Sequence, residues 1–382
     1  MRHSAMWSVV VSTVLVGACG TSSNVSTDSG PPPTDTAPAP SPFAPAAIEG
    51  VINSLVAAVA AQNTPASAKP PIAVLLKDTT TYWYPTIIGA NRMSTRLVTP
   101  FIVEAPLIVD PANTSPDQKA ALQNQYTQTF LAGKLYRGLA YAPQADNAET
   151  VEYLNQFIAQ CGPVVTVDSD APDTNRSYFI ATANYQAGAA AGNKLAEVLK
   201  PGDMVAVFGT TLTTWPSGIQ RAQGAEDALT AAGMVLAPRI SPVFDAATDT
   251  NAIIAELSDP TLSIKGLACM YSNSSNCAAA VEATGKTGLV QIVGFDMTTD
   301  TKTYFDKGYF YGVAVQRQYY MGELGVLVPY AIDVLGAAQT AALLQPILVP
   351  TDPSFIDTGI DMITTSNYAD YNAFLSSLGI NS

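Results

Sequence analysis

Short apolar runs alternate with longer helical segments along most of the chain. Strands are predicted at 71–76, 101–109, 138–142, 163–167, 203–208, 267–270 and 290–296. Helices are predicted between them at 116–131, 148–160, 185–199 and 219–232. Strands that alternate with helices of this length are the pattern of a doubly wound parallel sheet. The chain is therefore predicted to be an α/β protein with two such sheets, one in each of two lobes.

The passage 163–188 connects the two halves of this pattern. It begins as an apolar strand, continues with an acidic turn at 168–173 and a second apolar run at 178–182, and enters a helix near Asn184. Because no helix separates the two strands, the chain is predicted to cross from one lobe to the other here. Open α/β sheets bind ligands at the carboxyl ends of their strands. We therefore expect a hinge and one wall of a binding cleft at Asp168.

The first 45 residues show a different composition. Arg2 and the apolar run after it are typical of a secretory signal, and small residues directly precede Cys19. This ending resembles the bacterial lipobox, in which the cysteine is acylated and becomes the first residue; an ordinary signal with an incidental cysteine is the alternative. Residues 1–18 are then a signal peptide. Residues 19–45, rich in Ser, Thr, Pro, Asp and Ala, are predicted to be a lipidated, disordered tether.

Residues 46–69 are predicted to form an N-terminal helix and a linker. The helix, at 46–62, has an apolar face and is expected to pack on the main domain. The apolar run of the signal is too short to span a membrane, and no later stretch qualifies. Membrane attachment is therefore expected only through the lipid.

Charge and composition exclude several classes of function. The net charge is −13, with 31 acidic and 18 basic residues, so nucleic acid is not an expected partner. The single histidine, His3, lies in the predicted signal, which leaves no histidine for a Ser-His-Asp triad, a Cys-His dyad or a metal site. No phosphate loop or dinucleotide glycine motif is present, so no cofactor is expected.

Four motifs occur in order along the chain. They are the crossover 179–188 (FIATANYQAG), the helix start 219–224 (IQRAQG), the strand 290–296 (VQIVGFD) and the second crossover 312–322 (GVAVQRQYYMG). In these the chain resembles the type I periplasmic binding proteins of sugar ABC importers, the ribose- and galactose-binding group. The resemblance covers residues 70–370 to within a few residues. It implies two lobes joined by a three-strand hinge, divided as 70–181 plus 317–350 and 182–316 plus 351–382.

The resemblance also implies ligand-binding residues. In the family, two aromatics follow the first strand, and Tyr82 and Trp83 match them; aromatic faces suit sugar rings, although core packing of one of the two is the alternative. Asp168 and Asp296 are expected to accept hydrogen bonds from sugar hydroxyls. The remaining candidates for ligand contact are Asn184, Trp215, Arg221, Phe244, Tyr271 and Gln316.

Two departures from the family leave the ligand open. Ile219 stands where ribose-binding proteins carry an arginine that contacts sugar, and Tyr271 begins a strand end that departs from the usual Asn-Asp. Trp215 is either a second aromatic plate or a plug that closes its loop against the sheet. These departures argue against assuming any particular sugar.

If Cys19 is acylated, three cysteines remain, Cys161, Cys269 and Cys277. Cys269 and Cys277 flank one loop and are plausible disulfide partners in an oxidising compartment, where a bridge would brace a ligand loop. Two ordinary buried thiols are the alternative.

The resemblance implies an exported, lipid-anchored, monomeric solute-binding protein that delivers a sugar-like molecule to an ABC permease. A binding module that signals to a chemoreceptor or sensor kinase is the first alternative. A carbohydrate-active enzyme is the second, and the sequence places no acid in an apolar pocket that would favour it.

Overall fold

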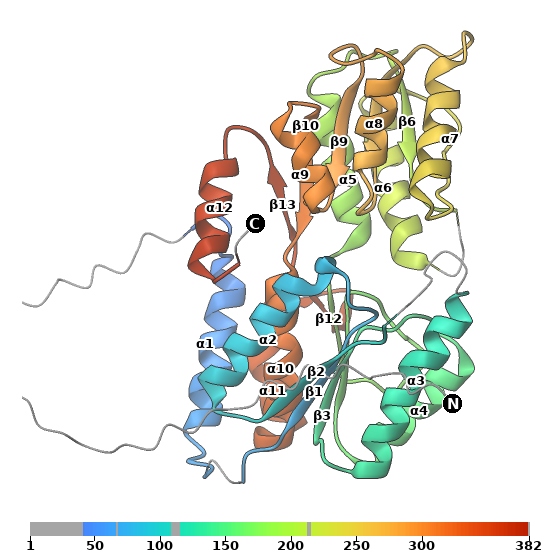
Figure 1. Cartoon of the computed structure of the whole chain (residues 1–382). Helices are drawn as coiled ribbons and strands as arrows, with labels where there is room; N and C mark the ends of the chain where they lie inside the picture. The colour runs from blue at the N-terminus through green and yellow to red at the C-terminus, as the bar shows by residue number, and fades with distance from the viewer. Residues whose placement is uncertain (1–40, 66–67, 108–114, 212–214, 381–382) are drawn as a thin grey trace, which may run out of the picture. The chain divides into compact units, whose positions relative to one another are not determined.

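The computed structural model describes residues 41–65, 68–107, 115–211 and 215–380 (Figure 1). In these residues the strands form one sheet of seven and one of six, each covered by helices. The prediction of two α/β lobes with parallel sheets is confirmed.

The first sheet belongs to the first lobe. Its strands, in spatial order, are β2 (Phe101–Glu104), β1 (Ile72–Leu75), β3 (Gly138–Tyr141), β4 (Val164–Val167), β5 (Tyr178–Ala181), β12 (Asp352–Asp357) and β11 (Leu348–Val349). All neighbours are parallel except β11 and β12. The helical elements of this lobe are α1 (Ala46–Ala60), η2 (Thr81–Trp83), α2 (Tyr84–Leu97), α3 (Pro116–Gly133), α4 (Ala148–Gln160), α10 (Gln318–Leu335), α11 (Ala337–Leu344) and η3 (Gln345–Ile347).

The second sheet belongs to the second lobe. Its strands, in spatial order, are β7 (Val235–Leu236), β6 (Met204–Phe208), β8 (Ile264–Cys269), β9 (Gln291–Phe295), β10 (Phe310–Gln316) and β13 (Ile360–Ile363). Only the pair of β10 and β13 is antiparallel. Its helices are α5 (Asn184–Ala196), α6 (Pro216–Ala231), α7 (Ala246–Ser258), α8 (Ser275–Ala283), α9 (Thr299–Asp306) and α12 (Tyr368–Ser377).

Each sheet has an apolar core on both of its faces. Alternate residues of β1 show why: Ala73 and Leu75 join the core beneath α3 and α4, whereas Ile72 and Val74 join the core beneath α2 and α10. Successive side chains of a strand point to opposite faces, so a strand that is buried on both sides is a continuous apolar run. This is the pattern by which the strands were predicted.

Three crossings join the lobes. Two lie where expected, between β5 and α5 and between β10 and α10. The third lies at Thr358 and Gly359, between β12 and β13, and not at residue 350. Residues 352–357 pair with β5 of the first sheet, and Phe355 lies in register with Phe179. The predicted assignment of residues 351–357 to the second lobe was therefore wrong.

The helix α12 also departs from the predicted division. Tyr371 packs in the second lobe, whereas Leu378 and Ile380 pack against the core of the first lobe. Phe43 is buried against this helix, with its ring centroid 5.3 Å from that of Tyr371 and 6.1 Å from that of Phe374. Packed structure therefore begins within the predicted tether 19–45, and the C-terminal residues touch both lobes.

The predicted N-terminal helix is confirmed as α1, which packs on α10 and α11 of the first lobe. Within the described residues, no helix combines the length and the apolar character needed to cross a membrane.

Candidate functional site

Three predicted site residues have left-handed backbone conformations. Asp168 directly follows β4 with φ of 66°, Asp296 directly follows β9 with φ of 62°, and Phe244 precedes α7 with φ of 65°. Such conformations cost about 1–3 kcal/mol each in residues other than glycine and cluster at binding sites. This backbone geometry places both carboxylates at the carboxyl ends of parallel strands, where ligands bind in open α/β sheets.

Asp168 is the central residue in the part of the site that the first lobe provides. It accepts hydrogen bonds from Lys77 Nζ at 3.0 Å and from the Tyr82 hydroxyl at 2.6 Å. Burial alone would raise the pKa of Asp168, but the Lys77 charge and the Tyr82 hydrogen bond outweigh it and lower that pKa. Asp168 is therefore held as a carboxylate. Lys77 also donates to Ser169 Oγ at 2.6 Å.

Lys77 was missed by the sequence interpretation. It lies two residues after the end of β1, so a polar residue close to that strand end was the available signal.

Asp296 and Gln316 form the matching part of the second lobe. Gln316 Nε2 donates to Asp296 Oδ1 at 3.1 Å and to the Tyr82 hydroxyl at 2.9 Å. Burial raises the pKa of Asp296 to about 6, against the opposing charge of Arg221. Burial and the Asp168 carboxylate raise the pKa of Tyr82 well above its ordinary value, so this hydroxyl remains a donor.

Arg221 and Asn184 form a fixed pair beside these carboxylates. Arg221 Nε and Nη2 donate to Asn184 Oδ1 at 3.1 and 2.7 Å, and Nη1 donates to a backbone carbonyl, Met270 O, at 3.3 Å. The close crossing of α5 and α6 places the pair, because a Cβ at Gly188 would lie 1.8 Å from the Arg221 carbonyl oxygen. A Cβ at Gly224 would in turn lie 2.0 Å from the carbonyl oxygen of Tyr185. Two glycines thus let the helices approach and orient the guanidinium.

These residues form one polar cluster between the lobes, made up of Lys77, Tyr82, Asp168, Asn184, Arg221, Asp296 and Gln316. The charge of Arg221 acts on both Asp168 and Asp296. With both carboxylates ionised, two positive and two negative side chains balance. The cluster can therefore donate and accept hydrogen bonds without favouring a charged ligand.

Three predicted aromatics gather next to one another in the second lobe. The ring of Trp215 lies 5.5 Å from that of Phe244 and 6.3 Å from that of Tyr271, centroid to centroid. Phe244 is 47% exposed, so it has a face available to a ligand. The Tyr271 hydroxyl instead donates to the buried Asp249 at 2.9 Å. The hydroxyl proton of Tyr271 is therefore bonded within the lobe, and ligand contact by Tyr271 stays a prediction.

Trp83 borders the polar cluster from the core side, with its ring centroid 6.0 Å from Lys77 Nζ. It is 2% exposed, belongs to the core of the first lobe and meets the Tyr82 ring edge-on with centroids 4.9 Å apart. Core packing accounts for this position, and stacking on a ligand stays a prediction for Trp83.

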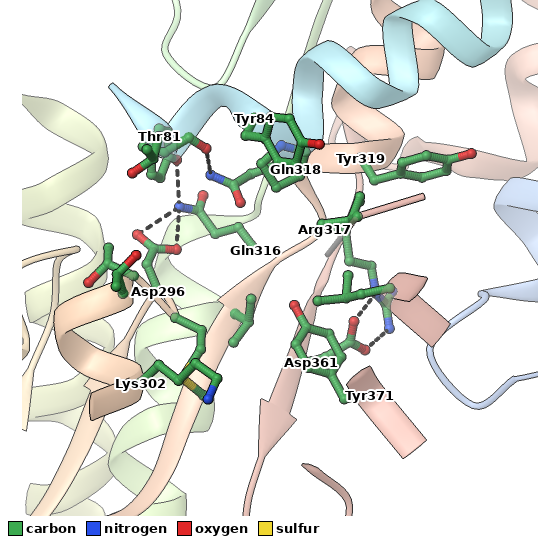
Figure 2. Close-up of a pocket in the computed structure, with 18 of the residues that line it drawn as sticks. Thr81, Tyr84, Asp296, Lys302, Gln316, Arg317, Gln318, Tyr319, Asp361 and Tyr371 are labelled. Atoms are coloured by element: carbon green, nitrogen blue, oxygen red, sulfur yellow. Dashed lines mark hydrogen bonds and ion pairs between the residues drawn. The ribbon is translucent and has the colours of Figure 1, made fainter. Parts of the chain in front are cut away.

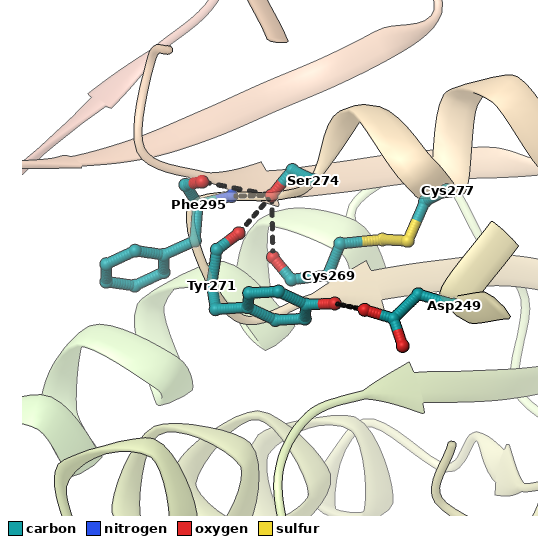
Figure 3. The surroundings of a disulfide bond; sticks show 6 residues. All are labelled: Asp249, Cys269, Tyr271, Ser274, Cys277 and Phe295. Atoms are coloured by element: carbon teal, nitrogen blue, oxygen red, sulfur yellow. Dashed lines mark hydrogen bonds between the residues drawn. A yellow bond between two sulfur atoms is a disulfide. The ribbon is translucent and has the colours of Figure 1, made fainter. Parts of the chain in front are cut away.

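Cys269 and Cys277 form a disulfide at the end of β8 (Figure 3). Between them, Ser274 Oγ accepts from the Phe295 backbone N–H at 2.7 Å and lies 2.8 Å from the Tyr271 carbonyl oxygen. The bridged loop is thereby bonded to the residue that precedes Asp296. Cys161 is the free cysteine of the described chain.

A pocket of about 470 Å³ adjoins the polar cluster (Figure 2). It is lined by η2 and α2, by the connection from β9 to α9, by the β10–α10 crossing and by α12. Asp296, Gln316 and Tyr82 belong both to its wall and to the cluster. The described residues contain no group of His, Cys, Asp and Glu side chains arranged to hold a metal ion.

The family model described as "Periplasmic binding protein domain" matches residues 72–333. The chain belongs to this family. The predicted family is thus confirmed, and a search of curated proteins finds no match.

Solved periplasmic binding proteins share the fold of this family member. An ABC transporter solute-binding protein from Burkholderia graminis, in complex with D-arabinose, is 21% identical with a TM-score of 0.65, covering 78% of this chain and 96% of that chain. GanP, a glucose-galactose binding protein from Geobacillus stearothermophilus, is 23% identical with a TM-score of 0.61, covering 78% and 98%. An Agrobacterium vitis solute-binding protein bound with α-D-tagatopyranose is 20% identical with a TM-score of 0.65, covering 79% and 97%.

The predicted signal peptide, the acylated Cys19 and the tether as far as residue 40 lie outside the described residues of this periplasmic binding protein. They remain predictions.

Proposed function

We propose that this periplasmic binding protein captures a neutral sugar or sugar-like molecule between its lobes and delivers it to an ABC permease. The observation that carries the proposal is the polar cluster. In it, Tyr82 donates to Asp168 and accepts from Gln316, and Gln316 also donates to Asp296. Carboxylates and amides are the partners that sugar hydroxyls need, and hydrogen bonds to ionised groups are the strong ones. The sugars named with the solved structures support this ligand class.

Capture would proceed by hinge closure. The three crossings are short segments between rigid lobes, which is the arrangement in which a few residues absorb a domain rotation. Ligand hydroxyls would replace contacts that the cluster now makes within itself, such as the bond from Gln316 to Tyr82. Phe244 would cover an apolar face of the ring.

The proposal includes export, acylation on Cys19, a monomeric state and release of the ligand unchanged. Cys19→Ala should move the protein from the membrane fraction to the soluble fraction of cells. Size-exclusion chromatography with light scattering reports the oligomeric state. Recovery of an unaltered sugar after prolonged incubation would separate binding from turnover.

Isothermal titration calorimetry of the mature chain against neutral mono- and disaccharides, polyols and cyclitols tests the ligand class. We expect saturable binding that weakens about ten- to a hundredfold in Asp296→Ala, because a charged acceptor is lost and its donors are left unpaired. Absence of binding by every compound of the panel, or unchanged binding in Asp296→Ala, would contradict the proposal.

A further inference from the structure

The pocket beside the polar cluster gives a bound molecule room to extend. Tyr82, Asp296 and Gln316 form one side of its wall, so a ring held by these residues lies at the pocket's edge. Its lining also includes Tyr84 of α2 and Phe374 of α12. Its volume of about 470 Å³ lies in the range of about 300–1,000 Å³ of sites that take drug-sized molecules.

The lining of this pocket combines aromatic faces with small polar groups. Tyr84 is 44% exposed, and Tyr371 faces the pocket from α12 (Figure 2). Thr299 and Asn372 add a hydroxyl and an amide. Aromatic faces beside hydroxyl and amide groups suit a molecule with apolar C–H patches and many hydroxyls.

The charged side chains of the wall are already paired. Arg317 donates to both carboxylate oxygens of Asp361 at 3.0 and 2.6 Å. Lys302 donates to Asp306 at 2.8 Å, and Gln316 donates to Asp296. With Asp296 ionised, the charged residues of the wall carry two positive and two negative charges (Lys302, Arg317, Asp296 and Asp361), so the wall has no net charge and favours a neutral occupant.

We propose that the ligand of this protein is larger than a single sugar ring. A disaccharide or other neutral glycoside would place one ring in the polar cluster and its second unit in the pocket, against Tyr84. This inference rests on the proposed function and narrows its ligand class. Helix α12 forms part of the pocket wall and packs on both lobes.

The test is calorimetry on the mature chain with matched pairs: D-galactose with lactose, D-glucose with maltose and cellobiose, and each monosaccharide with its phenyl glycoside. At least one of the larger partners should bind about tenfold or more tightly than its monosaccharide. Tyr84→Ala should remove most of that advantage, about five- to tenfold, and leave monosaccharide affinity unchanged. Tyr185→Ala is the matched control, because Tyr185 is 42% exposed and does not line this pocket.

The outcomes separate this inference from the proposed function. Monosaccharides that bind at least as tightly as every larger partner would overturn the inference and leave the sugar-binding function standing. An equal loss in Tyr84→Ala and Tyr185→Ala would overturn it too. Absence of binding by every sugar and glycoside would remove the proposed function and the inference together.

Discussion

Gln316 Nε2 donates a hydrogen bond of 2.9 Å to the Tyr82 hydroxyl, and this contact joins the sheet of the second lobe to the first lobe. Tyr82 in turn donates to Asp168 at 2.6 Å, while Gln316 also donates to Asp296. One hydroxyl therefore connects the two carboxylates that we propose as ligand acceptors. We therefore propose that closure of the lobes and preparation of the site depend on the same bonds.

Tyr82→Phe should shift the ligand-free protein toward an open arrangement of the lobes. The ring and its packing stay, while the bond to Gln316 is lost and Asp168 keeps Lys77 as its partner. The expected cost in unfolding free energy is about 0.5–1.5 kcal/mol. Small-angle X-ray scattering should show a larger radius of gyration without ligand, and Tyr84→Phe serves as the control. Identical scattering profiles for Tyr82→Phe and the unaltered protein would contradict this role.

Ligand affinity should fall as the pH drops through about 6, where burial places the pKa of Asp296. Only the ionised carboxylate accepts from two sugar hydroxyls, so the binding constant should lose up to about tenfold per pH unit below that value. Titrations between pH 5 and 8 with a neutral sugar measure this directly. Asp296→Asn should abolish the dependence.

The folding stability of the ligand-free protein should depend on the ionisation of Asp296 in the opposite direction to ligand affinity. Because the folded-state pKa of Asp296 is raised above its ordinary value of 3.8, protonation favours the folded state. The contribution of Asp296 to stability is therefore present below pH 3.8 and is lost as the pH rises through about 6.

For ligand affinity, a binding constant that is equal at pH 5 and pH 7.5 would rule out Asp296 as an ionised acceptor.

In Arg221→Gln, the pH below which ligand affinity falls should be higher than in the unaltered protein. The charge of Arg221 opposes the burial that raises the pKa of Asp296, so its removal should raise that pKa further. The lost donors to Asn184 should also cost about 1–3 kcal/mol of stability. Arg239→Gln removes a half-buried arginine that pairs with Glu226 in the same lobe, and it should leave the pH midpoint unchanged. Equal midpoints in both variants would show that Arg221 does not act on Asp296.

The sequence predicted what depends on local pattern. The alternation of apolar runs and helical segments predicted both sheets, and Asp168 could be found because it directly follows an apolar strand. Asp296 was found because the strand 290–296 resembles a family motif. Partners that come together only through folding were not visible. Lys77 meets Asp168 across 91 residues of sequence, and Tyr271 finds its acceptor Asp249 on a different element. Phe43, a single aromatic in a polar segment, gave no periodic signal for its packing on α12.

Loss of the Cys269–Cys277 disulfide should destabilise the second lobe. The bridge closes a short loop with a sequence separation of 8, for which the chain-entropy relation gives about 2–3 kcal/mol. Denaturant unfolding of the Cys269→Ser, Cys277→Ser double variant should show this loss, and a reducing agent should reproduce it in the unaltered protein. Cys161→Ser is the control for thiol effects. An unfolding free energy that does not change on reduction would show that the bridge contributes nothing to stability.

Glu323→Gln should stabilise the protein at alkaline pH. Glu323 lies in α10, is 1% exposed and accepts from the Tyr319 hydroxyl at 3.1 Å, while Arg92 Nε lies 3.8 Å away. Burial raises the pKa of Glu323 from 4.5 to about 7, against the opposing charge of Arg92. Since the folded-state pKa is raised, the stability contributed by the proton is present below pH 4.5 and is lost as the pH rises through about 7.

The amide of Glu323→Gln keeps the side chain's shape without the charge, so at pH 8 the variant should be more stable by about 2–4 kcal/mol. Urea unfolding at pH 5 and pH 8 measures the difference, which should be small at pH 5. Glu152→Gln, at an exposed site where the carboxylate accepts from Gln156, should change stability little at either pH. The stability that Glu323→Gln gains over the unaltered protein should be larger at pH 8 than at pH 5. If it is not, Glu323 is not a carboxyl held protonated by burial.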